Sequence, residues 1–184
     1  MLVEKNKDLR RDFIAMDTAN NVLVEKTKNL RRDFTATGYV TNPERTKILV
    51  VFHNKLQKWL PAGGHMDPNE LPHETALREV FEETGVKARI VSDDQDIGLR
   101  GEVDCQIPRP YGVLYQIIPK NSKDIEHIHV DFIYTMEAEE SELKGRAEEV
   151  SKVAWLTKDE VLACDCFDSV KGFVRDYLKD GKSV

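Results

Sequence analysis

Residues 63–86 read GGHMDPNELPHETALREVFEETGV, and the rest of the chain is best understood from this stretch. Two glycines, expected to form a turn, and an acidic loop precede a segment rich in glutamate. Apolar residues recur in that segment at intervals of three and four, which predicts the packed face of a helix. The positions on this face are Leu77, Val80, Phe81 and Thr84, with Ala76 at its edge. Pro72 suits a first helical turn and Gly85 a left-handed residue that ends a helix, so both ends are marked.

The glutamates of this segment fall on the other side of the predicted helix. Glu79, Glu82 and Glu83 stand at i, i+3 and i+4, so their carboxylates converge. Like charges at this spacing destabilise a helix by roughly a few tenths of a kcal/mol per pair, unless water or a counter-charge screens them. A divalent cation is one such counter-charge, and the guanidinium of Arg78 can hold Glu70 or Glu82. Taken alone, a glutamate-rich helix is more often a solvated face.

The spacing of the fixed residues favours the metal-binding interpretation. Gly64 is followed after five residues by Glu70, and after seven more by REVFEETGV at 78–86. This order resembles the Nudix box of the Nudix (MutT-like) hydrolase superfamily at every fixed position, and nine specified positions over 23 residues leave little room for chance. The preceding WLPAGGH at 59–65 also resembles the family's lead-in to the box. The resemblance covers roughly residues 35–160.

The resemblance implies a fold and a reaction. The fold is of the α/β (α+β) class, the Nudix fold, with a mixed β-sheet sandwiched between α-helices. The reaction is hydrolysis of a nucleoside diphosphate linked to another group, cut at a phosphoanhydride with water as the nucleophile. The implied cofactor is Mg²⁺, for which Mn²⁺ can substitute. Bound divalent cations activate water and neutralise phosphate charge, and Mg²⁺ favours a few carboxylates with water and phosphate oxygens.

The resemblance also assigns roles to residues within the box. The implied metal ligands are the Gly63 carbonyl and the carboxylates of Glu79, Glu82 and Glu83. Arg78 is implied to orient these carboxylates, and Glu70 to secure the loop against the helix. The set therefore comes from the two glycines and from one turn of the helix.

One further glutamate is implied from outside the box. In the family, a glutamate ahead of a tryptophan and an apolar residue approaches the metal cluster, and Glu149 before Trp155 is the best match, with Glu148 as the fallback. From the local sequence alone, either is more often a surface carboxylate. The base that activates water is either Glu79 or Glu149, because members of the family place it differently. The implied catalytic set is Arg78, Glu79, Glu82, Glu83 and Glu149.

Composition limits the other possibilities. A length of 184 residues fits one domain with a sizeable core. The net charge of -6 argues against a nucleic-acid polymer as partner, since such binding needs clustered Lys and Arg. The chain contains neither a run of about 18 apolar residues nor a signal-peptide pattern, so we expect a cytoplasmic protein without a membrane partner. Its three cysteines lack metal-site spacing and are expected to be structural or free thiols.

The N-terminal part contains a duplication. Residues 2–15 recur at 23–36 with eleven of fourteen positions identical. Two copies are too few for a solenoid. Because the second copy runs into the first predicted strand, we expect residues 1–22 to be an N-terminal extension and residues 23–184 to be the Nudix hydrolase domain. The first copy is then an extension, a recent duplication or a start-site artefact, and is expected to be dispensable.

The remaining elements follow from periodicity and turn signals. Strands are expected at 34–40, 47–53, 88–91, 111–118 and 126–134, with another after residue 147. Residues 137–142 are expected to form an acidic loop. Thr157 and Glu160 form a capping box that opens a helix, and an amphipathic helix follows from Phe167.

His127, His129 and Asp131 alternate along a predicted strand and therefore point to one side of it. They offer ligands for a second metal. The more ordinary alternatives are that they line the substrate groove or hydrogen-bond within the sheet.

Markers that narrow the substrate are mostly absent from the sequence. We expect a small-molecule nucleotide, foremost a nucleoside triphosphate, intact or damaged, with a nucleotide sugar as the alternative. Substrate choice is expected to depend on Trp59, the acidic loop 92–96, Arg109 and the strand at 127–131. A non-catalytic nucleotide-binding module is a different class of function, disfavoured because every box carboxylate is retained. The resemblance also allows a homodimer.

Overall fold

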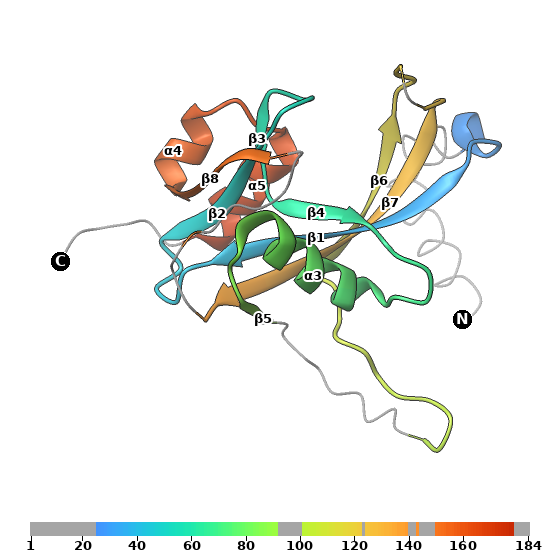
Figure 1. The fold of residues 1–184 in the computed structure, drawn as a ribbon, viewed down its shortest axis with the longest axis horizontal. Coiled ribbons are helices and arrows are strands. Elements are labelled where there is room, and N and C mark those ends of the chain that lie inside the picture. Colours follow the sequence, from blue (N-terminus) through green and yellow to red (C-terminus); the bar gives the residue numbers. More distant parts are fainter. Residues whose placement is uncertain (1–24, 92–100, 123, 140–142, 144–149, 179–184) are drawn as a thin grey trace, which may run out of the picture. The chain divides into compact units, whose positions relative to one another are not determined.

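The computed structural model describes residues 25–91, 101–122, 124–139, 143 and 150–178. The repeat at 2–15, the acidic loop 92–96, Glu148 and Glu149 lie outside these residues. The elements along the described chain are β1 (Arg32–Thr41), β2 (Lys47–His53), β3 (Lys58–Leu60), β4 (Ala62–His65), α3 (Pro72–Thr84), β5 (Ala88–Ile90), β6 (Gly112–Ile118), β7 (His127–Ala138), β8 (Val150–Thr157), α4 (Lys158–Ala163) and α5 (Asp168–Tyr177) (Figure 1).

The strands form one mixed sheet. Its order is β3-β2-β1-β7-β5, with β4 also paired to β1, β6 to β7 and β8 to β2. The neighbours β1 and β2, like β2 and β8, are antiparallel. The strands β1 and β7 run in the same direction, because Thr35 contacts Asp131 while Thr41, further along, contacts Met136. The predicted α/β (α+β) class is confirmed.

The central strand β2 is buried on both sides, as its apolar run predicted. Successive side chains of a strand point to opposite faces, so Leu49 and Val51 enter one core while Ile48 and Val50 enter another. The helix α3 covers the first face through Ala76 and Val80.

The opposite face of the sheet is covered by the C-terminal helices. The buried residues that pack there come mainly from three strands and two helices, and they include Tyr39 of β1, Val161 of α4, and Val170, Phe173 and Val174 of α5. The ring of Tyr39 lies 4.3 Å from that of Phe173, centroid to centroid. The sheet is therefore sandwiched between helices, as predicted.

The predicted capping box at the start of α4 is present. The Thr157 backbone N–H donates to the Glu160 carboxylate over 2.7 Å, and the Glu160 N–H faces the Thr157 hydroxyl. This reciprocal pair satisfies two backbone donors that the first helical turn leaves without intrahelical partners.

Two predictions about element boundaries are wrong. The pair Gly63–Gly64 is not a turn but part of strand β4, whose residues pair with β1 from Thr35 to Gly38. The acidic loop does not begin at residue 137, because Glu137 and Ala138 still belong to β7. Glu137 pairs there with Arg89 of β5, both in strand register and as an ion pair.

The chain divides into two compact units. The smaller comprises residues 1–32 and 117–128, and the larger comprises residues 33–116 and 129–184. Within the described part of the smaller unit, the Arg31 guanidinium pairs with the Asp124 carboxylate, and the Ile128 N–H donates to the Arg31 carbonyl over 2.9 Å. The predicted boundary after residue 22 lies outside the described residues and stays a prediction. Among the described residues, no helix is long and apolar enough to cross a membrane.

Candidate active site

The site is built on α3, whose ends are those that the sequence predicted. Pro72 occupies the first turn, and Gly85 ends the helix in the left-handed region with a φ of 72°. The Gly85 N–H donates to the Phe81 carbonyl over 2.8 Å. At the other end, the Glu74 carboxylate accepts from the Leu71 N–H over 2.9 Å. Both ends of the helix are therefore fixed by local hydrogen bonds.

The packed face of α3 is rotated from the predicted one. Phe81 is 40% exposed, whereas Thr75 and Thr84 are fully buried beside Ala76 and Val80. The threonines tolerate burial because their hydroxyls find partners: Thr75 donates to Glu70 over 2.7 Å, and Thr84 donates to the Val80 carbonyl. The prediction that Phe81 packs inward is therefore wrong.

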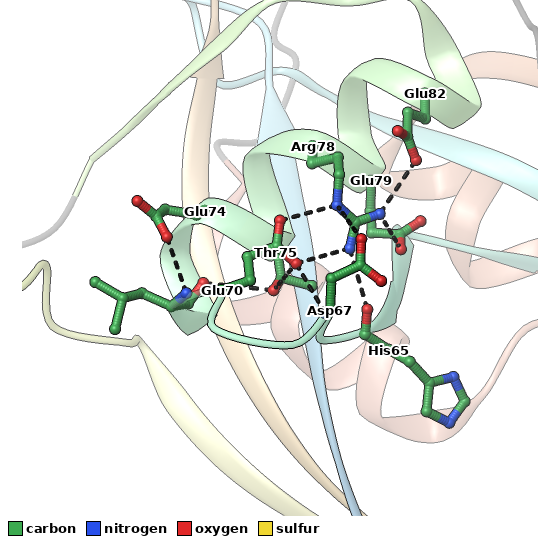
Figure 2. Close-up of polar contacts among 9 residues, drawn as sticks. His65, Asp67, Glu70, Glu74, Thr75, Arg78, Glu79 and Glu82 are labelled. Carbon is green, nitrogen blue, oxygen red and sulfur yellow. Dashed lines mark hydrogen bonds and ion pairs between the residues drawn. The ribbon is translucent and has the colours of Figure 1, made fainter.

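Arg78 is the centre of a polar network on α3 (Figure 2). Its Nε and Nη2 atoms donate to the two carboxylate oxygens of Glu70 over 2.8 and 2.9 Å, a bidentate pair. Its Nη1 atom donates to Glu79 over 2.7 Å and to Glu82 over 3.1 Å. Its Nη2 atom also donates to the His65 carbonyl over 3.1 Å. The contacts with Glu70 and Glu82 that the sequence predicted are present.

Glu70 ties the loop before α3 to the helix. Besides the two bonds from Arg78, its carboxylate accepts from the Asp67 N–H over 3.1 Å and from the Thr75 hydroxyl. These donors, Arg78 foremost, stabilise the anion and lower the pKa of Glu70 to about 2. The same pairing raises the pKa of Arg78 above its ordinary value.

Glu79 lies against the strand β4. A methyl group at Gly64 would overlap with the Glu79 carboxylate, so glycine leaves the space that this side chain fills. Burial raises the pKa of Glu79 above its ordinary value, although Arg78 acts in the opposite direction. The carboxylate is thus only partly compensated by the one guanidinium beside it.

Glu83 approaches the same strand one residue earlier. Its carboxylate accepts from the Gly63 N–H over 3.2 Å. Because Gly63 lies opposite Thr37 of β1 and its N–H points away from β1, its carbonyl points to that same outer edge. The His65 carbonyl, two residues on, points there too and meets Arg78. The Gly63 carbonyl and the Glu83 carboxylate therefore share one edge of the strand.

This donor set suits a hard divalent cation. It offers carboxylate oxygens and one carbonyl, which are the ligands that Mg²⁺ and Mn²⁺ prefer. One guanidinium cannot neutralise the four carboxylates gathered around α3, and the Glu82 side chain is 56% exposed and able to reorient. The residues named by the resemblance within the box are brought together. Glu149 lies outside the described residues.

The sequence pattern indicated His127, His129 and Asp131 as possible ligands for a second metal, but it did not indicate that Asp33 and His65 lie beside His129. Asp131 takes no part in a metal site with His129, since it is buried and accepts hydrogen bonds from the hydroxyls of Thr35 and Thr37 over 3.1 and 2.9 Å. The alternative that Asp131 hydrogen-bonds within the sheet is confirmed. His129 lies instead beside His65, with ring centroids 4.8 Å apart. Asp33, His65 and His129 are far apart in the sequence, and the register of β1, β4 and β7 brings them together.

Two residues expected to influence substrate choice lie on the α5 side of the sheet. Trp59 packs edge-on against Phe52, with ring centroids 5.3 Å apart, and therefore serves packing. Arg109 lines a cavity of about 270 Å³ together with Arg45, Tyr111 and Tyr177. No pattern in the sequence indicated this cavity, because its lining comes from five separate segments.

The family of the chain follows from comparison with known proteins. The sequence model described as the NUDIX domain matches residues 31–175. The chain belongs to the NUDIX family. A NUDIX-family hydrolase from Clostridium perfringens has a structure with a TM-score of 0.66 and 25% identity, covering 80% of this chain and 97% of that one.

Curated relatives of this NUDIX chain are similar over shorter stretches. A probable DHNTP pyrophosphohydrolase of Lactococcus lactis is 33% identical over 96 residues, which is 52% of this chain and 49% of that protein. An asymmetrical bis(5'-nucleosyl)-tetraphosphatase of Rattus norvegicus is 35% identical over 82 residues, 43% of this chain and 53% of that protein. The NUDIX chain thus spans about half the length of these relatives.

Proposed function

We propose that the protein is a divalent-metal-dependent hydrolase that cleaves a phosphoanhydride bond of a nucleoside diphosphate derivative. The observation that carries this proposal is the convergence of Glu79 and Glu83 on the two glycines of β4, with Arg78 joining Glu79 to Glu82. A non-catalytic binding module needs no such concentration of oxygen ligands on one helix face. A nucleotide-binding role without hydrolysis is therefore the weaker alternative.

The proposed metal ligands are the carboxylates of Glu79, Glu82 and Glu83 and the carbonyl of Gly63. A divalent cation held there, Mg²⁺ or Mn²⁺, supplies charge neutralisation for the phosphates and lowers the pKa of water. Arg78 fixes the orientation of two of these carboxylates before substrate binds. Glu70 fixes Arg78 in turn through its bidentate pair.

The proposed reaction consumes one water molecule. Its oxygen forms a bond to phosphorus while the bond from that phosphorus to the bridging oxygen breaks, and the base takes the proton of the water. Glu79 is one candidate for the base, because its carboxylate lies in the carboxylate group of α3, between Gly64 and Arg78. Glu149 is the other candidate. The base must be deprotonated to act, so the acidic limb of the pH profile should disappear when the true base is substituted and persist when the other glutamate is.

The leading proposed substrate is a nucleoside triphosphate, intact or damaged, and a nucleotide sugar is the alternative that the sequence already suggested. The tetraphosphatase among the relatives favours a longer phosphate chain as a second candidate. One is named for DHNTP and another for a bis(5'-nucleosyl) tetraphosphate. We therefore include a dinucleoside tetraphosphate among the substrates to be tested.

The test is a panel assay on the purified chain. Nucleoside triphosphates, nucleotide sugars and dinucleoside polyphosphates are incubated with Mg²⁺, with Mn²⁺ or with excess chelator, and the products are separated by ion-exchange chromatography. We expect metal-dependent cleavage of a phosphoanhydride in at least one class. Tight binding of a nucleotide without cleavage, under every metal condition, would instead support the binding module. Size-exclusion chromatography with light scattering tests the predicted homodimer on the same preparation.

A further inference from the structure

Three strands place two imidazoles and one carboxylate together on the sheet face that does not carry α3. Asp33 lies on β1, His65 ends β4 and His129 lies near the start of β7. In the register of β1 with β4, Thr35 is opposite His65, so Asp33, two residues from Thr35, shares their face. The bond from Thr35 to Asp131 places the odd-numbered residues of β7 on that face as well.

The distances within this group suit the binding of one metal ion by all three side chains. The potential metal-binding atoms of Asp33, His65 and His129 lie within 4.8 Å of one another. The Nε2 atom of His65 is 3.8 Å from Oδ2 of Asp33, and its ring stands at 85° to that of His129. Ligands at about 2.0–2.2 Å from a tetrahedral Zn²⁺ are roughly 3.4 Å apart, so small side-chain rotations suffice.

The backbone of this group is fixed while one side chain can adjust. All three residues belong to strands of the central sheet, and the Asp33 side chain is only 21% exposed. The His65 side chain is 61% exposed, so its ring can rotate toward an ion at small cost. Figure 2 shows this ring pointing away from Arg78 and from the carboxylates of α3. The group is therefore separate from the proposed catalytic site, although both use β4.

We propose that Asp33, His65 and His129 form a second metal site, selective for a borderline transition ion such as Zn²⁺ or Co²⁺. Imidazole nitrogens favour these ions, whereas the oxygen-only group on α3 favours Mg²⁺ or Mn²⁺. The competing explanation is an ordinary ion pair between Asp33 and a protonated His65.

Metal binding to the two groups can be measured separately. Isothermal titration calorimetry with Zn²⁺ is performed in excess Mg²⁺, so that Mg²⁺ occupies the oxygen ligands of α3. The chain carries Cys105→Ser, which removes an exposed thiol that could compete for Zn²⁺. Co²⁺ absorption in the visible range reports the coordination geometry. The variants in this background are His65→Ala and His129→Ala. His53→Ala is the matched control, since His53 is a strand histidine outside the group.

We expect the Cys105→Ser chain to bind one equivalent of Zn²⁺. The Kd of this binding should rise by at least about tenfold in His65→Ala and His129→Ala, but not in His53→Ala. The same two variants should lose the absorption of four-coordinate Co²⁺. Circular dichroism checks folding, and His65→Ala is decisive if His129→Ala misfolds. Equal Zn²⁺ stoichiometry and affinity in wild type and His65→Ala would overturn the proposal and leave the ion pair as the explanation. Neither result depends on hydrolytic activity.

Discussion

Gly64 and Glu79 share one space: the carboxylate of Glu79 fills the position that a side chain at residue 64 would occupy. The strand β4 therefore determines where a carboxylate of α3 is placed. Because the overlapping atoms are the far end of a flexible side chain, a methyl group at residue 64 displaces the carboxylate rather than the backbone. Function and stability can thus be separated at this residue.

Gly64→Ala is expected to lower turnover by about 100-fold, since displacing a catalytic group by about 1 Å has effects of that size. The free energy of unfolding should change by less than about 1 kcal/mol. Steady-state kinetics and urea unfolding measure the two quantities. Gly172→Ala is the matched control, because a methyl group there has no neighbour within 4 Å and replaces a helical glycine. A Gly64→Ala variant with normal turnover would contradict the proposed role of Glu79.

Glu83→Gln is expected to lower turnover by about two orders of magnitude or more, since the amide is a poor ligand for a divalent cation. The fold should be unchanged, because the amide oxygen can still accept from the Gly63 N–H. Glu74→Gln, on the same helix but outside the group, controls for loss of charge. Wild-type rates of Glu83→Gln in saturating Mg²⁺ would refute the metal assignment.

Arg78→Lys is expected to lower kcat by at least about tenfold. An ammonium group cannot reproduce the bidentate pair with Glu70 while also contacting Glu79 and Glu82. Arg89→Lys, at an exposed ion pair with Glu137, is the control and should behave as wild type. If Arg78→Lys retained full kcat, positioning by the guanidinium would be unnecessary.

The lowered pKa of Glu70 predicts that the stability of the folded protein depends on pH. Its folded pKa of about 2 lies below its ordinary value of 4.5, so ionised Glu70 stabilises the folded state above pH 4.5. This stabilisation is lost as the pH falls from 4.5 toward 2. Urea unfolding at a series of pH values should therefore show a smaller loss of stability over this window in Glu70→Gln than in wild type. Parallel curves would show that the pairing with Arg78 contributes nothing.

The first copy of the repeat is expected to be dispensable. A chain starting at Met16 removes residues 1–15, which lie ahead of the region matched by the NUDIX family, residues 31–175. Its kcat/KM and its unfolding midpoint should equal those of the full chain. A clear loss of either would assign a role to the duplicated segment.

Local patterns in the sequence predicted the elements of the fold well. Pro72 and Gly85 gave the ends of α3, and the apolar run from Ile48 gave a strand buried on both faces. The same patterns failed where tertiary contacts decide. Helical spacing placed both Phe81 and Thr84 on the packed face, but Phe81 is 40% exposed, whereas Thr84 is buried and its hydroxyl donates to the Val80 carbonyl.

The part of the candidate site that lies within one helix was predicted from the sequence. Arg78, Glu79, Glu82 and Glu83 lie within two turns of one helix, so their spacing defines their arrangement. The group of Asp33, His65 and His129 depends on the register of three strands, which single-sequence patterns do not determine. The glycine pair was mistaken for a turn because glycine is common in turns, whereas here Gly64 allows the close approach of Glu79 and Gly63 lies close to Ala36 and Thr37 of β1.

The alternation of side chains along β4 constrains how this chain can evolve. Gly64 faces α3 while His65 faces the opposite side of the sheet, so consecutive residues of one short strand contribute to two distinct groups. Insertion or deletion of one residue within Ala62–His65 would exchange these faces, placing an imidazole against Glu79 and a glycine where His65 now stands. Point substitutions can adjust either group alone. Changes in length at this strand are expected to abolish both at once, so descendants of this sequence should vary in composition here but not in length.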